Sequence, residues 1–351
     1  MDSMSGHEAD RMTLPSAVRE LPDSGEPLRI AGPRRWVRRL WPVVMLAAGA
    51  AYFAFGVLAL RAQRGEGMLA FDTYTYFYPN VVHALHSLRA GGGLLWNPYQ
   101  NCGQPFAAIS QVGLLYPVNL VFALLDRQPA LIVNALINLI IGGIGAFLLC
   151  RELSLGVVAA LAGALAFQLG GTAAMLAAWS PMHIAPYVWI PVAMWRLERL
   201  LRQPSFPTAA WLGIVLTIQL LPGFPQTAVF TYQLIALRTG WALLGRPPKP
   251  FRLLAAVAFG CVLPLFLGAV QLLPSIEVAR ESLRNLPLGG RELGYSYTWQ
   301  GLRTALMFPG RHLYPGTAVV PALVMLCAIG LLARQRSGLA LFYFGVTILY
   351  A

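Results

Sequence analysis

Long apolar stretches recur along this chain from Trp41 to its last residue, and they limit the fold more than any other feature. An α-helix needs about 20 mostly apolar residues to cross the roughly 30 Å hydrocarbon core of a bilayer. Because 57% of the residues are hydrophobic and only 11% are charged, a soluble globular protein is not expected. The chain is predicted to be an all-α integral membrane protein, a polytopic helical bundle.

Nine stretches are predicted to be transmembrane helices. They are residues 41–60, 130–150, 156–178, 183–199, 208–222, 226–244, 253–274, 317–333 and 338–351. The last stretch stops with the chain, which indicates either the N-terminal part of a longer protein or a short final helix. Residues 1–40 are polar, end in basic residues and lack apolar periodicity, so we expect a disordered cytoplasmic tail before a transmembrane domain of residues 41–351.

Basic residues close to helix ends remain on the cytoplasmic side of a membrane, so their distribution predicts the orientation. RRWVRRL precedes the first expected span, and the loops on the same side contain Arg151, Arg196, Arg199, Arg202, Arg246, Lys249, Arg252, Arg334 and Arg336. The N-terminus is therefore expected in the cytoplasm. These residues also explain most of the net charge of +12, so a nucleic-acid partner is not expected. The expected partner of this surface is the lipid bilayer.

Two long outer loops, about 61–129 and 275–316, interrupt the expected spans. In the first loop, Pro79 fits the first turn of an amphipathic helix that the glycines 91–93 end. Its apolar face would hold Phe77, Val81, Leu85 and Leu88, and its polar face Asn80, His83 and Ser87. We expect this helix to lie in the membrane interface. Residues 107–125 form either a second interfacial or re-entrant element or a short spanning helix, and the arginine pattern favours the former.

Asp72 is a conspicuous carboxylate just before this helix, and two interpretations apply to it. It is a candidate general base, or it caps the helix that follows. In the second loop, Arg280 and Arg284 are four residues apart and would share one helical face, able to hold a phosphate; Arg311 is a further candidate. The alternative for these arginines is ion pairing with Glu277 and Glu281.

Several polar and aromatic residues are candidates for sugar binding or cavity lining. Trp96, Asn97 and Tyr99 suit sugar contact, although anchoring at the interface explains the two rings equally well. His183 lies at an expected outer helix start and is a candidate for lining the cavity. Gln226, at the outer end of another expected helix, either faces the cavity or helps to initiate that helix. The polar residues inside the spans are expected to form interhelical hydrogen bonds: Asn134, Asn138, Gln168, Gln219 and Gln271.

Several motifs follow Asp72 in a fixed order: YFYPN, LWNPYQNCGQPF and QVGLLYPVN, then LPGFPQT at 221–227 and QLLPSIEVARESLR at 271–284. Over about residues 70–315 the chain resembles the YfhO-like bacterial membrane proteins, which are related to the GT-C glycosyltransferases. The resemblance implies a GT-C-like fold in the bacterial cytoplasmic (inner) membrane. It also implies inverting transfer of a sugar from a polyprenyl-phosphate-linked donor to a cell-envelope glycan or polymer on the outer face.

The same resemblance assigns roles to individual residues. Asp72 matches the acidic residue of the first outer loop and would be the catalytic base or a metal ligand. Gln111, which begins QVGLLYPVN, joins the expected substrate-binding residues. Many relatives have a second acidic residue nearby, whereas this loop offers only Glu66 and Asp126. Binding of a divalent cation, Mg²⁺ or Mn²⁺, is therefore an open alternative, and no cofactor is firmly implied.

Two other functions fit a polar cavity in a membrane protein: a flippase or transporter of lipid-linked sugars, and a non-catalytic protein of envelope assembly. Ion-coupled transporters keep ionisable residues within their spans. No Asp or Glu lies in the middle of an expected span, and Arg238 is close enough to an inner helix end to snorkel into water. This pattern favours chemistry at the outer face over ion-coupled transport.

Overall fold

The computed structural model describes residues 33–63, 72–100 and 102–282. The chain divides into two compact units, residues 1–41 and 42–351, and the contacts discussed below lie within the second. The described part is mostly helical, in agreement with the expected class, and one short hairpin departs from it.

The elements that precede the long central helices are mostly short. They are α1 (Pro33–Ala51), the π-helices η1 (Tyr52–Ala59) and η2 (Thr73–Phe77), α2 (Leu60–Gln63), α3 (Tyr78–Arg89), strands β1 (Trp96–Asn97) and β2 (Gln104–Pro105), the 3₁₀ turns η3 (Ser110–Val112) and η4 (Pro117–Leu120), and α4 (Val121–Leu124). The strands pair antiparallel. Because α1 begins at Pro33, residues 33–40 are helical, whereas the sequence predicted the end of a disordered tail there.

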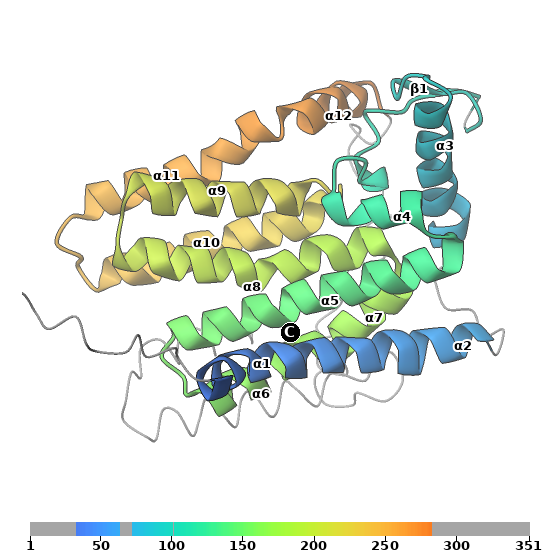
Figure 1. The fold of residues 1–351 in the computed structure, drawn as a ribbon. Coiled ribbons are helices and arrows are strands. Elements are labelled where there is room, and N and C mark those ends of the chain that lie inside the picture. Colours follow the sequence, from blue (N-terminus) through green and yellow to red (C-terminus); the bar gives the residue numbers. More distant parts are fainter. Residues whose placement is uncertain (1–32, 64–71, 101, 283–351) are drawn as a thin grey trace, which may run out of the picture. The chain divides into compact units, whose positions relative to one another are not determined.

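From residue 127 onward the chain folds into longer helices. They are α5 (Arg127–Glu152), α6 (Val157–Leu169), α7 (Gly171–Trp179), α8 (Pro181–Arg202), α9 (Phe206–Leu220), α10 (Pro225–Leu244), α11 (Pro250–Leu267) and α12 (Ala269–Glu281). Helix α5 packs against α6 and α8, and α9 packs against α8 and α11 (Figure 1).

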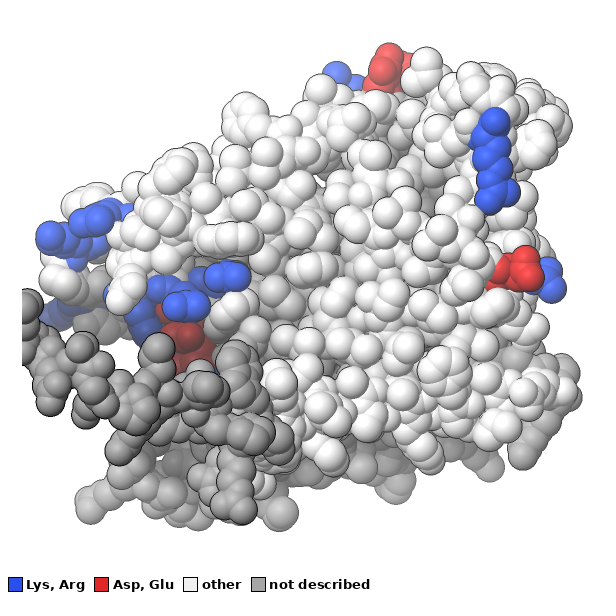
Figure 2. All heavy atoms as spheres, in the orientation of Figure 1, with Lys and Arg blue, Asp and Glu red and all other residues white. Residues whose placement is uncertain are grey.

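Charged side chains are concentrated at the two ends of α5 and α8, and Figure 2 shows an uncharged surface between them on the face in view. We call the end where both helices begin the Asp72 end, and the end where both stop the basic end. At the basic end, Arg202 of α8 pairs with Glu152 of α5, with Nη1 and Oε1 2.9 Å apart. The uncharged band between the two ends is what a membrane-embedded helical protein requires.

Four described helices are long and apolar enough to cross a membrane: Leu40–Ala59, Arg127–Glu152, Val157–Trp179 and Pro250–Leu267. They correspond to the expected spans 41–60, 130–150, 156–178 and 253–274, the third of which is interrupted at Gly170 between α6 and α7. The expected spans 183–199, 208–222 and 226–244 correspond to α8, α9 and α10. Helix α9 has 15 residues, a length of about 22 Å. Spans 317–333 and 338–351 lie outside the described residues, so the number nine stays a prediction.

Glycines allow the close approach of α5 to its neighbours. A Cβ atom on Gly145 would lie 2.5 Å from Cγ2 of Val192 on α8, and one on Gly143 would lie 2.9 Å from the amide of Gln168 on α6. Any larger residue would push these helices apart. Small residues at such contacts are typical of helices that pack in membranes, where the hydrophobic effect between helices is absent.

A polar network joins the η3–η4 segment to the middle of the bundle. The hydroxyl of Tyr116 donates to Oδ1 of Asn138 at 2.6 Å and accepts from Nε1 of Trp189 at 3.1 Å. Asn138 donates to Oδ1 of Asn134, and Asn134 donates to Oδ1 of Asn119 at 3.0 Å. Burial raises the pKa of the Tyr116 hydroxyl, which therefore stays protonated and able to donate.

The expected hydrogen bonds of the other buried amides are also confirmed. Gln168 donates to the carbonyl of Leu46 at 3.0 Å, which links α6 to α1. Gln219 donates to the carbonyl of Pro186 at 3.0 Å, which links α9 to α8. Gln168 and Gln219 thus connect separate helices, as membrane-embedded amides must when water is absent.

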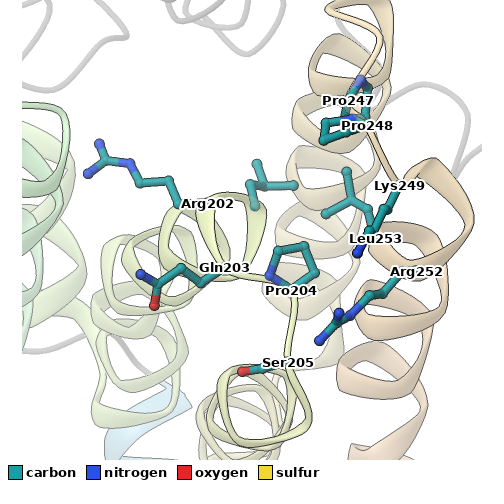
Figure 3. Close-up of a pocket in the computed structure, with 10 residues that line it drawn as sticks. Arg202, Gln203, Pro204, Ser205, Pro247, Pro248, Lys249, Arg252 and Leu253 are labelled. Atoms are coloured by element: carbon teal, nitrogen blue, oxygen red, sulfur yellow. The ribbon is translucent and has the colours of Figure 1, made fainter.

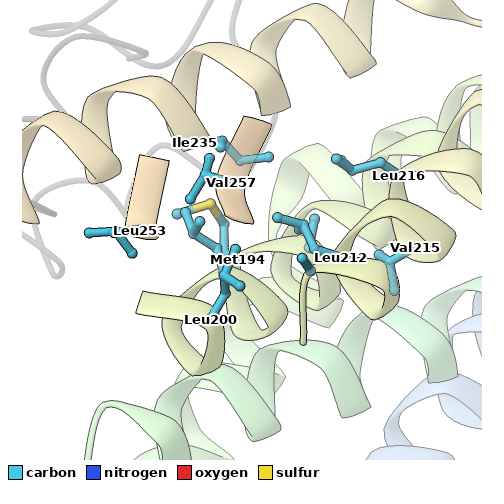
Figure 4. Close-up of a cluster of buried hydrophobic side chains, with 11 residues drawn as sticks. Met194, Leu200, Leu212, Val215, Leu216, Ile235, Leu253 and Val257 are labelled. Atoms are coloured by element: carbon cyan, nitrogen blue, oxygen red, sulfur yellow. The ribbon is translucent and has the colours of Figure 1, made fainter. Parts of the chain in front are cut away.

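Arg238 does not snorkel, and that prediction was wrong. Its Nε and Nη2 donate to Oε1 and Oε2 of Glu198 at 2.6 and 2.9 Å. Only 7% of the Arg238 side chain and 3% of the Glu198 side chain are exposed. The two residues belong to different predicted spans, so the sequence spacing gave no sign of the pair. Beside this pair, the apolar cluster that includes Met194, Leu212 and Leu253 packs α8, α9 and α11 together (Figure 4).

The first outer loop folds largely as expected. Helix α3 starts next to Pro79, and the amide of Gly92 bonds to the carbonyl of Ser87 just after its end. Residues 107–125 contain only short turns and the four-residue α4, so the alternative of a spanning helix was wrong. Asn80 belongs to the predicted polar face of α3, and it contacts the hairpin there. Its side chain is fully buried, because the hairpin covers that side of α3.

Candidate functional site

Asp72 stands at the start of a helical segment that is fastened to α7. The next residue, Thr73, is fully buried and donates its hydroxyl to the carbonyl of Trp179 at 2.8 Å. Asp72 itself is exposed, and its φ and ψ of −60° and −28° are already helical. Its carboxylate makes no capping hydrogen bond, so the helix-cap interpretation was wrong. The side chain is left available for another role.

His183 is the residue that the structure brings to Asp72. It lies in the first turn of α8, and the negative charge of the Asp72 carboxylate acts electrostatically on its imidazole. The ring is also enclosed by aromatic neighbours, with centroids 4.5 Å from Phe224 and 6.4 Å from Trp179. The two residues are far apart in the sequence. The fold joins them because Thr73 binds the end of α7 directly before α8 begins.

Two buried polar atoms next to this contact have no hydrogen-bond partner among the described residues: Nδ1 of His183 and Oγ of Ser180. Ser180 is fully buried and stands at the N-cap position of α8, yet its hydroxyl does not cap the helix. Buried polar groups are nearly always hydrogen-bonded, so unpartnered atoms suggest a ligand or a catalytic role. We refer to Asp72, Ser180 and His183, with Trp179 and Phe224 as aromatic walls, as the Asp72 site.

A cation that the sequence did not single out lies beside the same segment. The guanidinium carbon of Arg127, the first residue of α5, lies 5.7 Å from the ring centroids of both Tyr74 and Tyr78. The signal was present in the aromatic stretch, because residues four apart share one face of a helix. These two rings therefore hold a positive charge close to the Asp72 segment.

Gln111 and Gln226 lie on two segments that meet at the Asp72 end. The hydroxyl of Ser110 donates to the carbonyl of Gly223 at 3.1 Å. Gly223 has a φ of +82°, and a Cβ there would lie 1.7 Å from the carbonyl oxygen of Ser110, so only glycine fits. Gln226 is exposed two residues after Phe224, which packs on His183, and Gln111 is half-buried in η3.

Helix α12 is attached to the same loop from another side. Nε2 of Gln271 donates to the carbonyl of Ala107 at 3.1 Å, and the Ser275 hydroxyl donates to the carbonyl of Ala108 at 2.9 Å. Arg280 is exposed in the last turn of α12, one and a half turns beyond Ser275. The other two predicted phosphate-binding residues, Arg284 and Arg311, lie outside the described part of the chain.

The residues Trp96, Asn97 and Tyr99 form part of the hairpin that covers α3. Asn97 is 1% exposed, and its side chain donates to Asn80 at 3.1 Å and accepts from the Tyr99 amide at 3.0 Å. It holds the hairpin to the helix and is not free to contact a ligand. Trp96 and Tyr99 are 54% and 83% exposed, and they remain available as aromatic surfaces.

The described residues at this end do not form a dedicated divalent-metal site, and Glu66, one of the two acidic candidates, lies outside the described part of the chain. Within residues 33–63, 72–100 and 102–282, no group of three or more His, Cys, Asp or Glu side chains could hold a metal ion. The Asp72 site offers one carboxylate and one imidazole, fewer protein ligands than a metal site normally uses.

No protein-family model matches the chain, and a search of curated proteins finds no significantly similar sequence.

Proposed function

We propose that this chain is a membrane glycosyltransferase that transfers a sugar from a polyprenyl-phosphate-linked donor to a hydroxyl of a cell-envelope acceptor on the outer face. The observation that carries the proposal is the exposed Asp72 carboxylate next to His183, whose Nδ1 lacks a partner within the described residues. A carboxylate and an imidazole in electrostatic contact suit proton transfer from an attacking hydroxyl. The resemblance to YfhO-like and GT-C proteins agrees with this chemistry.

In the proposed reaction the acceptor hydroxyl oxygen attacks the anomeric carbon of the donor sugar. The bond between that carbon and the phosphate oxygen breaks, and its electron pair leaves with the polyprenyl phosphate. Asp72 accepts the hydroxyl proton, and His183 orients the carboxylate or relays the proton. Attack from the side opposite the phosphate inverts the anomeric centre.

The leaving phosphate gains negative charge, so a nearby cation would lower the barrier. Arg127 is the best-placed candidate, because Tyr74 and Tyr78 hold it beside the Asp72 segment. Arg280 is the second candidate, on a helix bound to the loop that also contacts Gly223. Trp179 and Phe224 supply aromatic faces on which a sugar ring can stack.

A lipid-linked-sugar flippase or transporter is the second candidate function. The buried pair of Glu198 and Arg238 favours it, because ionisable residues inside a membrane bundle often mark a transport path. The pair is already neutralised, however, and lies on α8 and α10 toward the basic end, away from the polar atoms that lack partners at the Asp72 site. We therefore rank transfer chemistry first.

The test is a transfer assay with the purified full chain in proteoliposomes. Undecaprenyl phosphates carrying radiolabelled glucose or mannose serve as donors, and a crude envelope glycan fraction serves as acceptor, with and without EDTA. We expect transfer by the unchanged chain and a loss of about 100-fold or more in Asp72→Asn, the scale of general-base catalysis. Asp126→Asn, a second exposed carboxylate at the same end, is the matched control and should retain activity.

The outcomes separate the candidate functions. Equal activity of Asp72→Asn and the unchanged chain would remove Asp72 from the mechanism. Movement of the labelled lipid across the bilayer without any transfer would indicate the flippase. If neither transfer nor movement occurs with any donor, the scaffold function replaces both.

A further inference from the structure

A pocket of about 400 Å³ opens at the basic end, opposite the Asp72 site. It lies between the turn that joins α8 to α9 and the turn that joins α10 to α11 (Figure 3). Leu201, Pro204, Pro247 and Leu253 provide apolar walls. Leu253 is 2% exposed and belongs to the apolar cluster of Figure 4, so the floor of the pocket is continuous with the packed core.

The pocket carries positive charge that the described residues do not neutralise. Lys249 and Arg252 line it, and neither forms an ion pair within the described part of the chain. Figure 3 shows Arg252 reaching from α11 toward the turn at Pro204 and Ser205. Arg202 also lines the pocket, but its guanidinium extends the other way and pairs with Glu152. No acidic residue is among those that line the pocket.

The helix that begins at the pocket adds to its affinity for anions. Helix α11 starts after Lys249 with no side-chain cap and no acidic residue in its first turn. Its first backbone amides therefore lack intrahelical partners, and the helix dipole places partial positive charge there. Helix α9 differs, since Ser205 already accepts from the Thr208 amide. The uncapped start of α11 adjoins Lys249 and Arg252, both of which line the pocket, and a helix N-terminus beside basic side chains favours phosphate.

Apolar residues beside the pocket indicate that the anion is attached to a lipid. Phe206 and Phe251, in the first turns of α9 and α11, are 70% and 86% exposed. Leu244, at the end of α10, is 76% exposed. Apolar side chains of this size next to a basic pocket suit acyl chains below a charged headgroup. The arginine distribution also predicts that this end faces the anionic cytoplasmic leaflet.

We propose that the pocket binds the phosphate of an anionic phospholipid headgroup through Lys249, Arg252 and the N-terminus of α11, independently of any chemistry at the Asp72 end. Anionic phospholipid headgroups and inorganic phosphate share a phosphate group with net negative charge. A neutral zwitterionic headgroup has a phosphate but adds a cation, which the two basic side chains repel.

The experiment measures lipid binding by the full chain, purified in detergent, with native mass spectrometry. The probes are phosphatidylglycerol, phosphatidylcholine of the same acyl chains, and inorganic phosphate as a competitor. The test variant is Lys249→Gln with Arg252→Gln. The matched control is Arg246→Gln, which removes a basic residue of the same turn that does not line the pocket. All three side chains are exposed, and thermal unfolding without lipid checks that the variants remain folded.

We expect the unchanged chain to prefer phosphatidylglycerol over phosphatidylcholine, and the double variant to bind phosphatidylglycerol about 30-fold more weakly. Arg246→Gln should bind as the unchanged chain does. If Arg246→Gln weakens phosphatidylglycerol binding as much as the double variant does, net charge alone explains the binding. The proposal that the pocket binds the lipid would then be wrong. If inorganic phosphate displaces phosphatidylglycerol when both are present at the same concentration, the pocket is a site for free phosphate. The assignment to a lipid headgroup would then be wrong.

Discussion

The buried pair of Glu198 and Arg238 gives the sharpest prediction about stability. Two hydrogen bonds of 2.6 and 2.9 Å join the two side chains in a bidentate arrangement, and almost none of either is exposed. Removing one partner of such a pair costs about 3–5 kcal/mol, because the other charge stays buried. Replacing both partners by apolar residues of similar shape is often close to neutral.

We therefore expect Glu198→Met to destabilise the protein by about 3–5 kcal/mol, since the guanidinium of Arg238 cannot release its proton. Arg238→Met should cost less, because the carboxyl of Glu198 can take up a proton and become neutral. The double variant should recover most of the loss. Glu152→Gln is the control: Glu152 pairs with Arg202, whose side chain is 49% exposed, and such pairs contribute about 0–1 kcal/mol.

The free energy of unfolding is measured by titrating the purified chain from dodecyl maltoside into sodium dodecyl sulfate and following tryptophan fluorescence and circular dichroism. A loss in Glu198→Met no larger than that in the Glu152→Gln control would mean that Arg238 reaches water. The pair would then not be buried in the membrane, and the original prediction that the Arg238 side chain extends to water would be correct.

Three further predictions concern the segments that build the Asp72 end. Tyr116→Phe leaves Oδ1 of Asn138 without its 2.6 Å donor, and we expect a loss of about 1–3 kcal/mol in the same titration. Gly223→Ala must move the backbone of Ser110; we expect a fall in Tm, together with faster proteolysis of the loop around residue 110. Asn97→Ala removes two hydrogen bonds and leaves the buried Oδ1 of Asn80 without this donor; we expect a loss of about 1–3 kcal/mol, with hydrogen exchange at the amides of β1 and β2 accelerated most.

Much of the fold follows from the sequence, because apolar length and basic flanks are strong signals. The expected spans from 41–60 to 253–274 each have a helical counterpart, and the break between α6 and α7 falls at Gly170, a residue of low helix propensity. The start of α3 near Pro79 and its end before Gly91 were also readable from local rules. The prediction of interhelical hydrogen bonds was correct for Gln168 and Gln219, whereas Asn134 donates to the η4 turn, Asn138 within α5 and Gln271 to a loop carbonyl.

The candidate site was only partly predictable. Asp72 and His183 were each singled out, but their proximity depends on the bond from Thr73 to Trp179, which sequence spacing does not encode. Ser180 was missed because serine before a helix normally acts as a cap. The burial of Asn80 was not predictable, because a helical pattern cannot show that a hairpin covers the polar face.

The loop that carries Ala107 and Ala108 has a consequence for how such a protein can change over time. Gln271 and Ser275 of α12 bind main-chain carbonyls of this loop, so this attachment is indifferent to the side chains at those positions. A replacement of the half-buried Ala107 can therefore change its side chain while both hydrogen bonds to α12 are kept. The position of the loop on α12 is therefore set by its main chain, whereas buried side chains such as Phe106 and Val112 contribute to the packed core.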